Sequence, residues 1–253
     1  MNYLKNSILI FLSLVFFTAC IHKTPYTNRS QMIFVSSSEE LALGERSYQE
    51  ALSESKVIKN TKDSLRVQTI GQNIAKVADK PDYNWEFNLV EDSQVNAFCL
   101  PGGKVVVYTG ILQYAKNDDQ LATVISHEVA HALARHGAER MSQGMIQQGI
   151  GLIGNVAVAV AAPEYQNAFN TAYGVGSNLG VMLPYGRMQE SEADEIGIYL
   201  MHKAGYNINE ATKFWQNMSE DKEGGTDFFS THPSSENRVK DIQEVIDKIE
   251  TTK

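Results

Sequence analysis

The chain has 253 residues, of which 43% are apolar and 21% are charged, and its formal net charge is −8. This length and apolar content can build a full-sized hydrophobic core, as one large domain or two small ones. The negative charge provides no basic surface for nucleic acid, and no tandem repeat is visible.

The first twenty residues resemble a secretory signal. Lys5 is their only charge, the apolar run 8–17 is interrupted only by Ser13, and the small residue Ala19 precedes Cys20. A membrane span needs roughly twenty apolar residues, about twice this run. The sequence F-T-A-C is similar to a lipobox, which predicts cleavage before Cys20 and a lipid on its sulfur. An ordinary signal peptide with an incidental cysteine is the alternative.

These features divide the chain into a signal peptide at 1–19, a polar, lipidated tether at 20–35 and a domain at 36–253. If Cys20 carries a lipid, Cys99 has no partner for an internal disulfide. An exported domain of this kind must rest on its core alone. The apolar neighbours of Cys99 predict a buried, inert thiol.

Most of the expected elements are helices, which we infer from capping residues and from apolar positions at helical spacing. The expected helices cover 36–55, 61–79, a short segment from 109, a long segment from 118 or 119, 188–203, 209–220 and 235–250. Strands are expected at 85–90 and 104–108, the second after the turn at Pro101, Gly102 and Gly103. The chain is therefore expected to be α+β, mostly helical with a small sheet.

Residues 141–184 are apolar, but they are rich in glycine and interrupted by glutamine and asparagine. As a membrane span this segment is short and poor. We expect a helix that packs over the long helix from 118, or a mobile lid.

The strongest local signal is the H-E-x-x-H sequence of His127, Glu128 and His131 inside the long helix. Histidines four residues apart lie on one helix face, so both imidazoles can bind one metal ion. Glu128 is placed beside them to accept a proton from a zinc-bound water. Solvated histidines on a surface helix are the alternative. The apolar neighbours that argue against it are Val124, Ile125, Val129, Ala130 and Leu133.

A catalytic zinc needs a third protein ligand and an open position. Glu190 and Asp194 follow in a helical stretch and share one face, while Glu192 points away. One carboxylate could bind zinc while the other holds a ligating histidine through its second ring nitrogen. The residues alone leave open which of the three acids binds. Without the H-E-x-x-H sequence, an exposed acidic helix start would be the default interpretation.

The combination of motifs resembles metallopeptidase family forty-eight. The motifs are H-E-V-A-H-A-L-A-R-H at 127–136, E-S-E-A-D at 190–194, V-N-A-F-C-L-P-G-G-K-V-V-V-Y-T-G at 95–110, A-G-Y-N-I-N-E-A at 204–211 and S-T-H-P-S-S-E-N-R at 230–238. The chain is most similar to the short periplasmic lipoprotein branch without tetratricopeptide repeats. The resemblance implies a zincin domain of the gluzincin type, in which Glu190 joins His127 and His131 around one zinc ion and Asp194 completes the motif.

The implied reaction is peptide hydrolysis by a zinc-activated water, with Glu128 as the base and then as the proton donor to the leaving amine. His232 and Arg187 are candidates to stabilise the oxyanion. His232 could instead occupy the open zinc position in a resting state, or serve only as a helix cap before its proline. The other histidines, His22, His136 and His202, are expected at the surface or in packing.

Residues 96–107 are expected to give an edge strand along the cleft. Such a strand would pair with an extended substrate through backbone hydrogen bonds. The residues expected to contact substrate are Asn96, Ala97, Phe98, Gly102 and Gly103.

The expected function is a zinc endopeptidase that cuts misfolded or misassembled proteins of a bacterial envelope. Because Ile21 is no inner-membrane retention signal, we expect a lipid anchor on the periplasmic side of the outer membrane. The expected partners are polypeptide substrates, the membrane and the outer-membrane assembly machinery. One alternative is an assembly factor or chaperone that cuts rarely, and a weaker one is a zinc hydrolase of a substrate other than peptide.

Overall fold

A computed structural model describes residues 21–177, 183–220, 225–233 and 237–251. The helices are α2 (Ser37–Ser53), α3 (Lys62–Ala78), α4 (Asp118–Leu133), α5 (His136–Ala161), α6 (Gln166–Ser177), α7 (Leu183–Ala204), α8 (Asn209–Glu220), α9 (Gly225–Thr231) and α10 (Arg238–Thr251), with short 3-10 turns η1 (Thr109–Gln113) and η2 (Pro163–Tyr165). The strands are β1 (Ile21–Lys23), β2 (Ser30–Met32), β3 (Val57–Ile58), β4 (Glu86–Val90), β5 (Ala97–Leu100) and β6 (Lys104–Tyr108). The expected α+β, mostly helical class is confirmed.

The small sheet has the strand order β3-β4-β6-β5. β4 and β6 run parallel, with Phe87 opposite Val105 and Leu89 opposite Val107, and these four side chains are buried. β5 pairs antiparallel with β6 and forms one edge of the sheet. The expected edge strand therefore exists, over residues 97–100.

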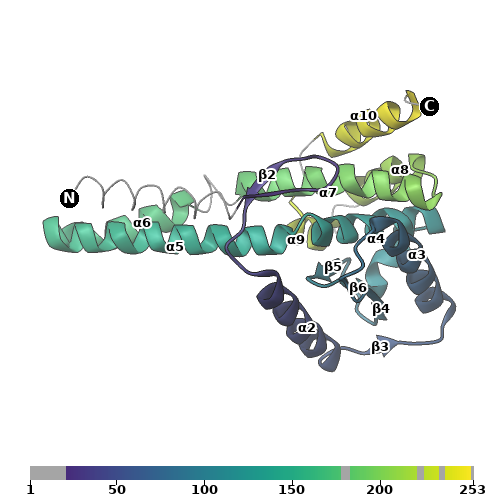
Figure 1. Cartoon of the computed structure of the whole chain (residues 1–253), viewed down its shortest axis with the longest axis horizontal. Coiled ribbons are helices and arrows are strands. Elements are labelled where there is room, and N and C mark those ends of the chain that lie inside the picture. Colours follow the sequence, from purple (N-terminus) through teal and green to yellow (C-terminus); the bar gives the residue numbers. More distant parts are fainter. Residues whose placement is uncertain (1–20, 178–182, 221–224, 234–236, 252–253) are drawn as a thin grey trace, which may run out of the picture.

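α4 is the central helix, because every residue from Gln120 to Leu133 is buried. It packs against α3 on one side and against α7 and α8 on others (Figure 1). α3 turns Val67, Ile70 and Ile74 into the core, whereas Leu65 of the expected apolar stripe is 52% exposed. The H-E-x-x-H sequence thus lies in the most buried helix of the described chain.

α4 ends at a sharp break before α5. Arg135 has a left-handed backbone with φ 55°, and its guanidinium bonds Glu40 Oε2 at 2.6 Å. A left-handed non-glycine residue costs roughly 1–2 kcal/mol, which the ion pair to the nearly buried Glu40 helps to offset. The break redirects the chain so that His136 opens α5 beside the end of α4.

Residues 21–32 differ from the expected polar tether. β1 and β2 form an antiparallel hairpin, and its turn places Thr24 in a buried position against α7. Gln31 Nε2 donates to Ala134 O at 2.8 Å. The hairpin folds onto the domain because its polar side chains find partners there, and composition alone does not reveal such partners.

α5 also differs from the expectation. It contacts α4 only near its start and then runs out of the domain beside α6 (Figure 1). At the point of exit, Arg140 Nε donates to Gln189 Oε1 at 2.6 Å and Gln189 Nε2 donates to Glu139 Oε2 at 2.7 Å. These bonds join α5 to α7 and form a clamp at the base of the α5–α6 hairpin. Beyond this clamp, α5 does not pack over α4.

Candidate metal centre

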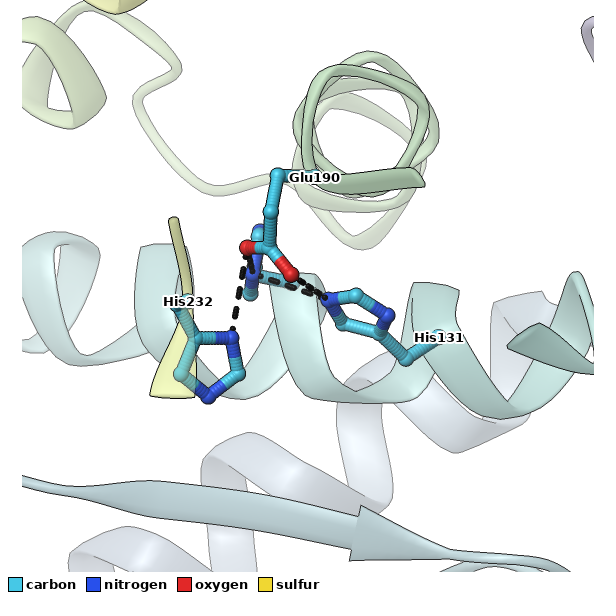
Figure 2. Close-up of side chains that lie close together, drawn as sticks. His131, Glu190 and His232 are labelled. Carbon is cyan, nitrogen blue, oxygen red and sulfur yellow. Dashed lines mark hydrogen bonds and ion pairs between the residues drawn. The ribbon is translucent and has the colours of Figure 1, made fainter. Parts of the chain in front are cut away.

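Four buried side chains that can ligate a metal come together from three places in the fold. His127 and His131 belong to α4, Glu190 belongs to α7, and His232 follows α9. One ligand atom of each lies within 4.8 Å of all the others. Figure 2 shows the Glu190 carboxylate between the rings of His131 and His232.

The geometry of this cluster fits a zinc ion. His127 Nε2 lies 3.1 Å from both His131 Nε2 and Glu190 Oε2, and His232 Nδ1 lies 3.2 Å from Glu190 Oε2. A tetrahedral ion with bonds of about 2.1 Å separates its ligand atoms by about 3.4 Å, close to these values. Glu190 Oε1 is buried without a hydrogen-bond partner in the part of the chain described. The donor set, together with a buried carboxylate oxygen that makes no hydrogen bond to the described residues, therefore suits the metal that the sequence predicts.

The electrostatics of the cluster also suit a cation. Burial would raise the pKa of Glu190, but the neighbouring histidines, His131 first among them, hold it far below its usual value. Burial would lower the pKa of His127, but Asp194 and Glu190 raise it to about 9. Burial also lowers the pKa of His131, which keeps that ring neutral and ready to ligate. Positive charge is thus favoured here, and a metal ion can take the place of the proton on His127.

The first ligating histidine is oriented by a carboxylate. His127 Nδ1 donates to Asp194 Oδ1 at 2.9 Å, which leaves Nε2 free for a metal. Asp194 also accepts from Arg238 Nη2 at 2.7 Å, and the Arg238 guanidinium stacks 3.3 Å from the centre of the Trp215 ring. Asp194 therefore holds a ligating histidine, one of the two roles expected for the acids of this helix.

The second ligating histidine is oriented through a further histidine. His131 Nδ1 lies 2.8 Å from His136 Nδ1, and His136 Nε2 lies 3.0 Å from Glu192 Oε2. Since Glu192 can only accept, His136 donates from Nε2 and accepts at Nδ1 from His131. This relay leaves His131 Nε2 free for the metal.

The relay ends at the N-terminal hairpin. Glu192 accepts hydrogen bonds from Thr24, Thr27 and Arg29, of which the Thr24 and Arg29 bonds measure 2.7 Å. Burial would raise the pKa of Glu192, but its bonds to His136, the two threonines and Arg29 lower it to about 2. His136 was expected at the surface or in packing, and Glu192 was expected to point away. Both are buried and linked to the site.

Glu128 lies beside the cluster with one oxygen available. Its side chain is buried, and Oε1 has no hydrogen-bond partner among the described residues. Burial raises the pKa of this carboxyl, so it holds a proton more readily than an exposed glutamate. Glu128 and His131 line a cavity of about 210 Å³ that opens to solvent.

The edge strand borders the same cavity. Phe98, Cys99 and Pro101 line it, and Ala97 O accepts from His232 Nε2 at 3.3 Å. Cys99 was expected to be buried, and the residue as a whole is partly exposed beside the cavity. Its thiol is nevertheless buried, which raises the pKa of that group well above its usual value. Asn96 Oδ1 lies 3.5 Å from Thr231 Oγ1, close to the site.

Gly102 and Gly103 have a conformational role. Both have positive φ, 86° and 85°, in the turn from β5 to β6. A Cβ on Gly103 would lie 2.6 Å from the Trp85 ring. The two glycines therefore shape the strand that borders the cavity, and neither lines it.

Arg187 does not belong to the cluster. It is exposed at the start of α7, and the cations that line the cavity are Arg135 and Arg140. Arg140 Nη2 lies 3.7 Å from Glu190 Oε1 and its side chain is 42% exposed. The prediction failed because position along α7 does not reveal which side of the helix faces the cavity. Arg238, which was not predicted, lies within the quoted S-T-H-P-S-S-E-N-R motif.

Residues 61–246 match the peptidase family M48. The chain is 34% identical over 236 residues to the mitochondrial metalloendopeptidase OMA1 of Schizosaccharomyces pombe, covering 91% of this chain and 68% of that protein. It is 29% identical to the human metalloendopeptidase OMA1, mitochondrial, covering 97% of this chain and 51% of the relative. The beta-barrel assembly-enhancing protease of Escherichia coli is 27% identical, over 70% of this chain and 37% of its own length.

These relatives contradict the expected location. The proteins that match more than nine tenths of the chain are named as mitochondrial, whereas the bacterial relatives match 70% of it. A periplasmic anchor in a bacterial outer membrane is therefore the wrong expectation. Cys20 lies outside the described residues, and its lipidation stays a prediction.

Proposed function

The chain belongs to peptidase family M48 and is a zinc metalloendopeptidase, and from this premise we propose that it cuts extended segments of misfolded or misassembled proteins. His127, His131 and Glu190 hold the zinc ion, and Glu128 is the general base. The observation that carries the proposal is the buried Glu128 carboxylate, which has a free oxygen beside the ligand cluster and faces an open cavity.

The residues divide the work of hydrolysis. Zinc supplies a Lewis acid that lowers the pKa of water and polarises a carbonyl. Glu128 takes a proton from the attacking water and returns it to the leaving amine, for which a buried carboxyl of raised pKa is suited. Asp194 and His136 fix the ring orientations of the two ligating histidines.

The edge strand β5 supports an extended substrate. An unfolded segment can add to this edge through its backbone, so recognition depends little on sequence. Phe98 and Pro101 provide apolar contacts along the cavity, and Thr231 also lines it. This arrangement selects for unfolded chain, since a folded domain offers no free strand.

We assign the oxyanion contact to Arg140 in place of Arg187. Arg140 lines the cavity next to Glu128 and His131, and its side chain is partly exposed, so it can reach a bound carbonyl. A preorganised cation at the developing negative charge is worth about 100-fold or more in rate when it is well placed.

A second function, a client-binding assembly factor that cuts rarely, is favoured by the position of His232. Its Nδ1 lies within the ligand set, so His232 can fill the fourth zinc position that a catalytic site keeps open. Its Nε2 is 3.7 Å from Glu128 Oε1. Cutting then requires that His232 leave, and substrate binding along β5 would compete with its contact to Ala97.

The test is cleavage of fluorescent casein by the purified full chain, together with its zinc content. Glu128→Gln should keep one zinc per chain and lose roughly 100- to 10,000-fold in rate. The matched control is Glu91→Gln, at a side chain that is 53% exposed at the end of β4, and it should cut at the wild-type rate. Wild-type cleavage by Glu128→Gln would refute the assignment of the base. Faster cleavage by His232→Ala would support a resting ligand, and slower cleavage would favour a role in catalysis.

A further inference from the structure

The outer part of α5 exposes a broad apolar face. Beyond Ser142, seven of its eight large apolar side chains are between 39% and 82% exposed, and Val158 is half-buried. Successive members of the exposed seven are one to four residues apart, and with about 3.6 residues per turn they all fall on one half of the helix circumference. The residues of this outer face are Met145, Ile146, Ile150, Leu152, Ile153, Val156 and Val160. An exposed patch of this kind on a protein marks an interaction surface.

The opposite side of α5 carries the polar and small residues, and it packs on α6. Asn155 Nδ2 donates to Asn170 Oδ1 at 2.9 Å, and Gln166 Nε2 donates to Asn155 Oδ1 at 2.6 Å. Tyr173 donates to Gln147 O at 2.7 Å, and its ring lies against Gly151. Amides face the partner helix while aliphatic side chains face outward, the reverse of a helix pair that is stable in water alone.

The charges of this segment select among possible occupants. Glu164 is the only charged residue between Arg140 and Arg187. A protein partner is normally met by a rim of polar and charged side chains, with arginine and aromatic residues enriched at the core. The outer face has aliphatic residues and methionine only, with no charge beside it. This composition fits hydrocarbon better than a protein surface.

The exposed side chains of α6 distinguish a hairpin that spans a bilayer from one that lies on its surface. Its exposed side chains include Asn167, Asn170 and Thr171, which are polar and uncharged. α5 is long and apolar enough to cross a membrane. However, a spanning hairpin would leave these polar groups in hydrocarbon, where their burial is unfavourable. A hairpin that lies in the interface plane puts α5 in lipid and α6 in water.

We propose that the outer face of α5 binds the surface of a lipid bilayer, with the α5–α6 hairpin parallel to the membrane plane. Because the face has no lysine or arginine and the chain carries a net charge of −8, binding does not depend on anionic lipid. The occupant is an uncharged lipid surface such as phosphatidylcholine. α5 begins at His136, so the same helix connects this surface to the second ligating histidine.

The test uses the full chain with phosphatidylcholine vesicles that contain brominated acyl chains. Ile153→Trp introduces a fluorophore on the outer face, and Thr171→Trp is the matched control on the exposed side of α6. Bromine quenches only a fluorophore that enters the bilayer. The native Trp85 and Trp215 lie in the domain, so the fluorescence of the wild-type chain gives the background. Above that background, we expect strong quenching for Ile153→Trp and at most weak quenching for Thr171→Trp.

A second measurement removes the apolar face. The triple variant Ile150→Asn, Ile153→Asn and Val156→Asn should lower vesicle binding at least tenfold, while casein cleavage shows that the domain is folded. The N-terminal apolar run is the same in both chains, so the difference reports on α5. Equal quenching of both tryptophan variants, or unchanged binding of the triple variant, would overturn the proposal. If the chain forms a dimer without lipid and the triple variant does not, the outer face binds a second copy and the proposal is wrong. A monomeric chain whose Ile153→Trp variant is not quenched would also refute lipid binding.

Discussion

His127 and His131 sit one turn apart on the same helix, yet each is held by a different kind of partner. His127 meets a carboxylate directly, since Asp194 accepts its Nδ1 proton and is itself held by Arg238. His131 meets another imidazole, and only beyond His136 does the chain of hydrogen bonds reach a carboxylate, Glu192.

The two sides also draw on opposite ends of the sequence. The His127 side is completed by Arg238 at the start of α10, and the His131 side is completed by Thr24, Thr27 and Arg29 of the N-terminal hairpin. Asp194 bonds the ligating His127 directly, whereas the influence of Glu192 reaches His131 only through His136. We therefore expect that a substitution weakens zinc binding less when more hydrogen bonds separate the substituted residue from the metal.

The largest effect on zinc binding is expected at Glu190, whose carboxylate contacts both sides. Glu190→Gln removes the one anionic ligand, so zinc affinity should fall by more than the roughly 10- to 100-fold that is typical of residues behind the ligands. Zinc competition against a chromogenic chelator measures this, with exposed Ser191→Ala on α7 as the control. Retention of wild-type affinity would remove Glu190 from the ligand set.

The next effect is expected at Asp194. Asp194→Asn leaves His127 without its anionic partner and Arg238 without its 2.7 Å ion pair, so zinc affinity should fall about 10- to 100-fold. The same chelator competition measures it. The zinc-free variant should also unfold at a lower temperature, because the arginine is buried and loses its closest carboxylate.

A smaller effect is expected at Glu192. Glu192→Gln should weaken zinc binding by about tenfold or less, because His136 stands between this side chain and the ligand. The comparison with Asp194→Asn in one titration series is the informative result. An equal or greater loss at Glu192 would contradict the idea that the relay dilutes the effect.

The smallest effect on zinc, with a large one on stability, is expected at Arg29. Its guanidinium pairs with Glu139 and Glu192, whose side chains are 0% and 5% exposed. Arg29→Ala should therefore destabilise the fold by about 3–5 kcal/mol while zinc affinity changes only a few-fold. Thermal unfolding measures the first quantity, and exposed Lys23→Ala in the same hairpin is the control.

Arg187 lies outside both sets of hydrogen bonds to the ligating histidines, and no effect of its removal is expected. Because its side chain is exposed at the start of α7 and does not line the cavity, Arg187→Ala should leave cleavage and zinc affinity unchanged. Arg140→Ala, tested beside it on casein, should lower kcat about 100-fold or more. A loss at Arg187 with none at Arg140 would restore the original assignment of the oxyanion contact.

The sequence could predict whatever depends on spacing within one element. The pairs His127 and His131, and Glu190 and Asp194, follow from the helical period, and β6 was placed at its observed bounds because five apolar or amphipathic residues follow a Gly-Gly turn. The apolar surroundings of His127 correctly placed it in a buried helix.

The rest depends on contacts between elements, which spacing does not encode. His136 reaches His131 only because Arg135 adopts a left-handed backbone and turns the chain between two helices. The polar composition of residues 21–32 predicts a linker. Their fold depends on hydrogen bonds that Thr24, Thr27 and Arg29 donate to the distant Glu192. α5 was expected to pack inward because apolar residues normally do so, and no local signal distinguishes an inward from an outward apolar face.

The clamp at the base of the α5–α6 hairpin has a consequence for how such chains diverge. Arg140 and Glu139 near the start of α5 both bond Gln189 of α7, the residue before the candidate ligand Glu190. The α5–α6 segment beyond these bonds contributes none of the four clustered metal-binding residues. We therefore expect that a longer, shorter or exchanged hairpin would change the surface that this peptidase contacts and leave its metal ligands in place.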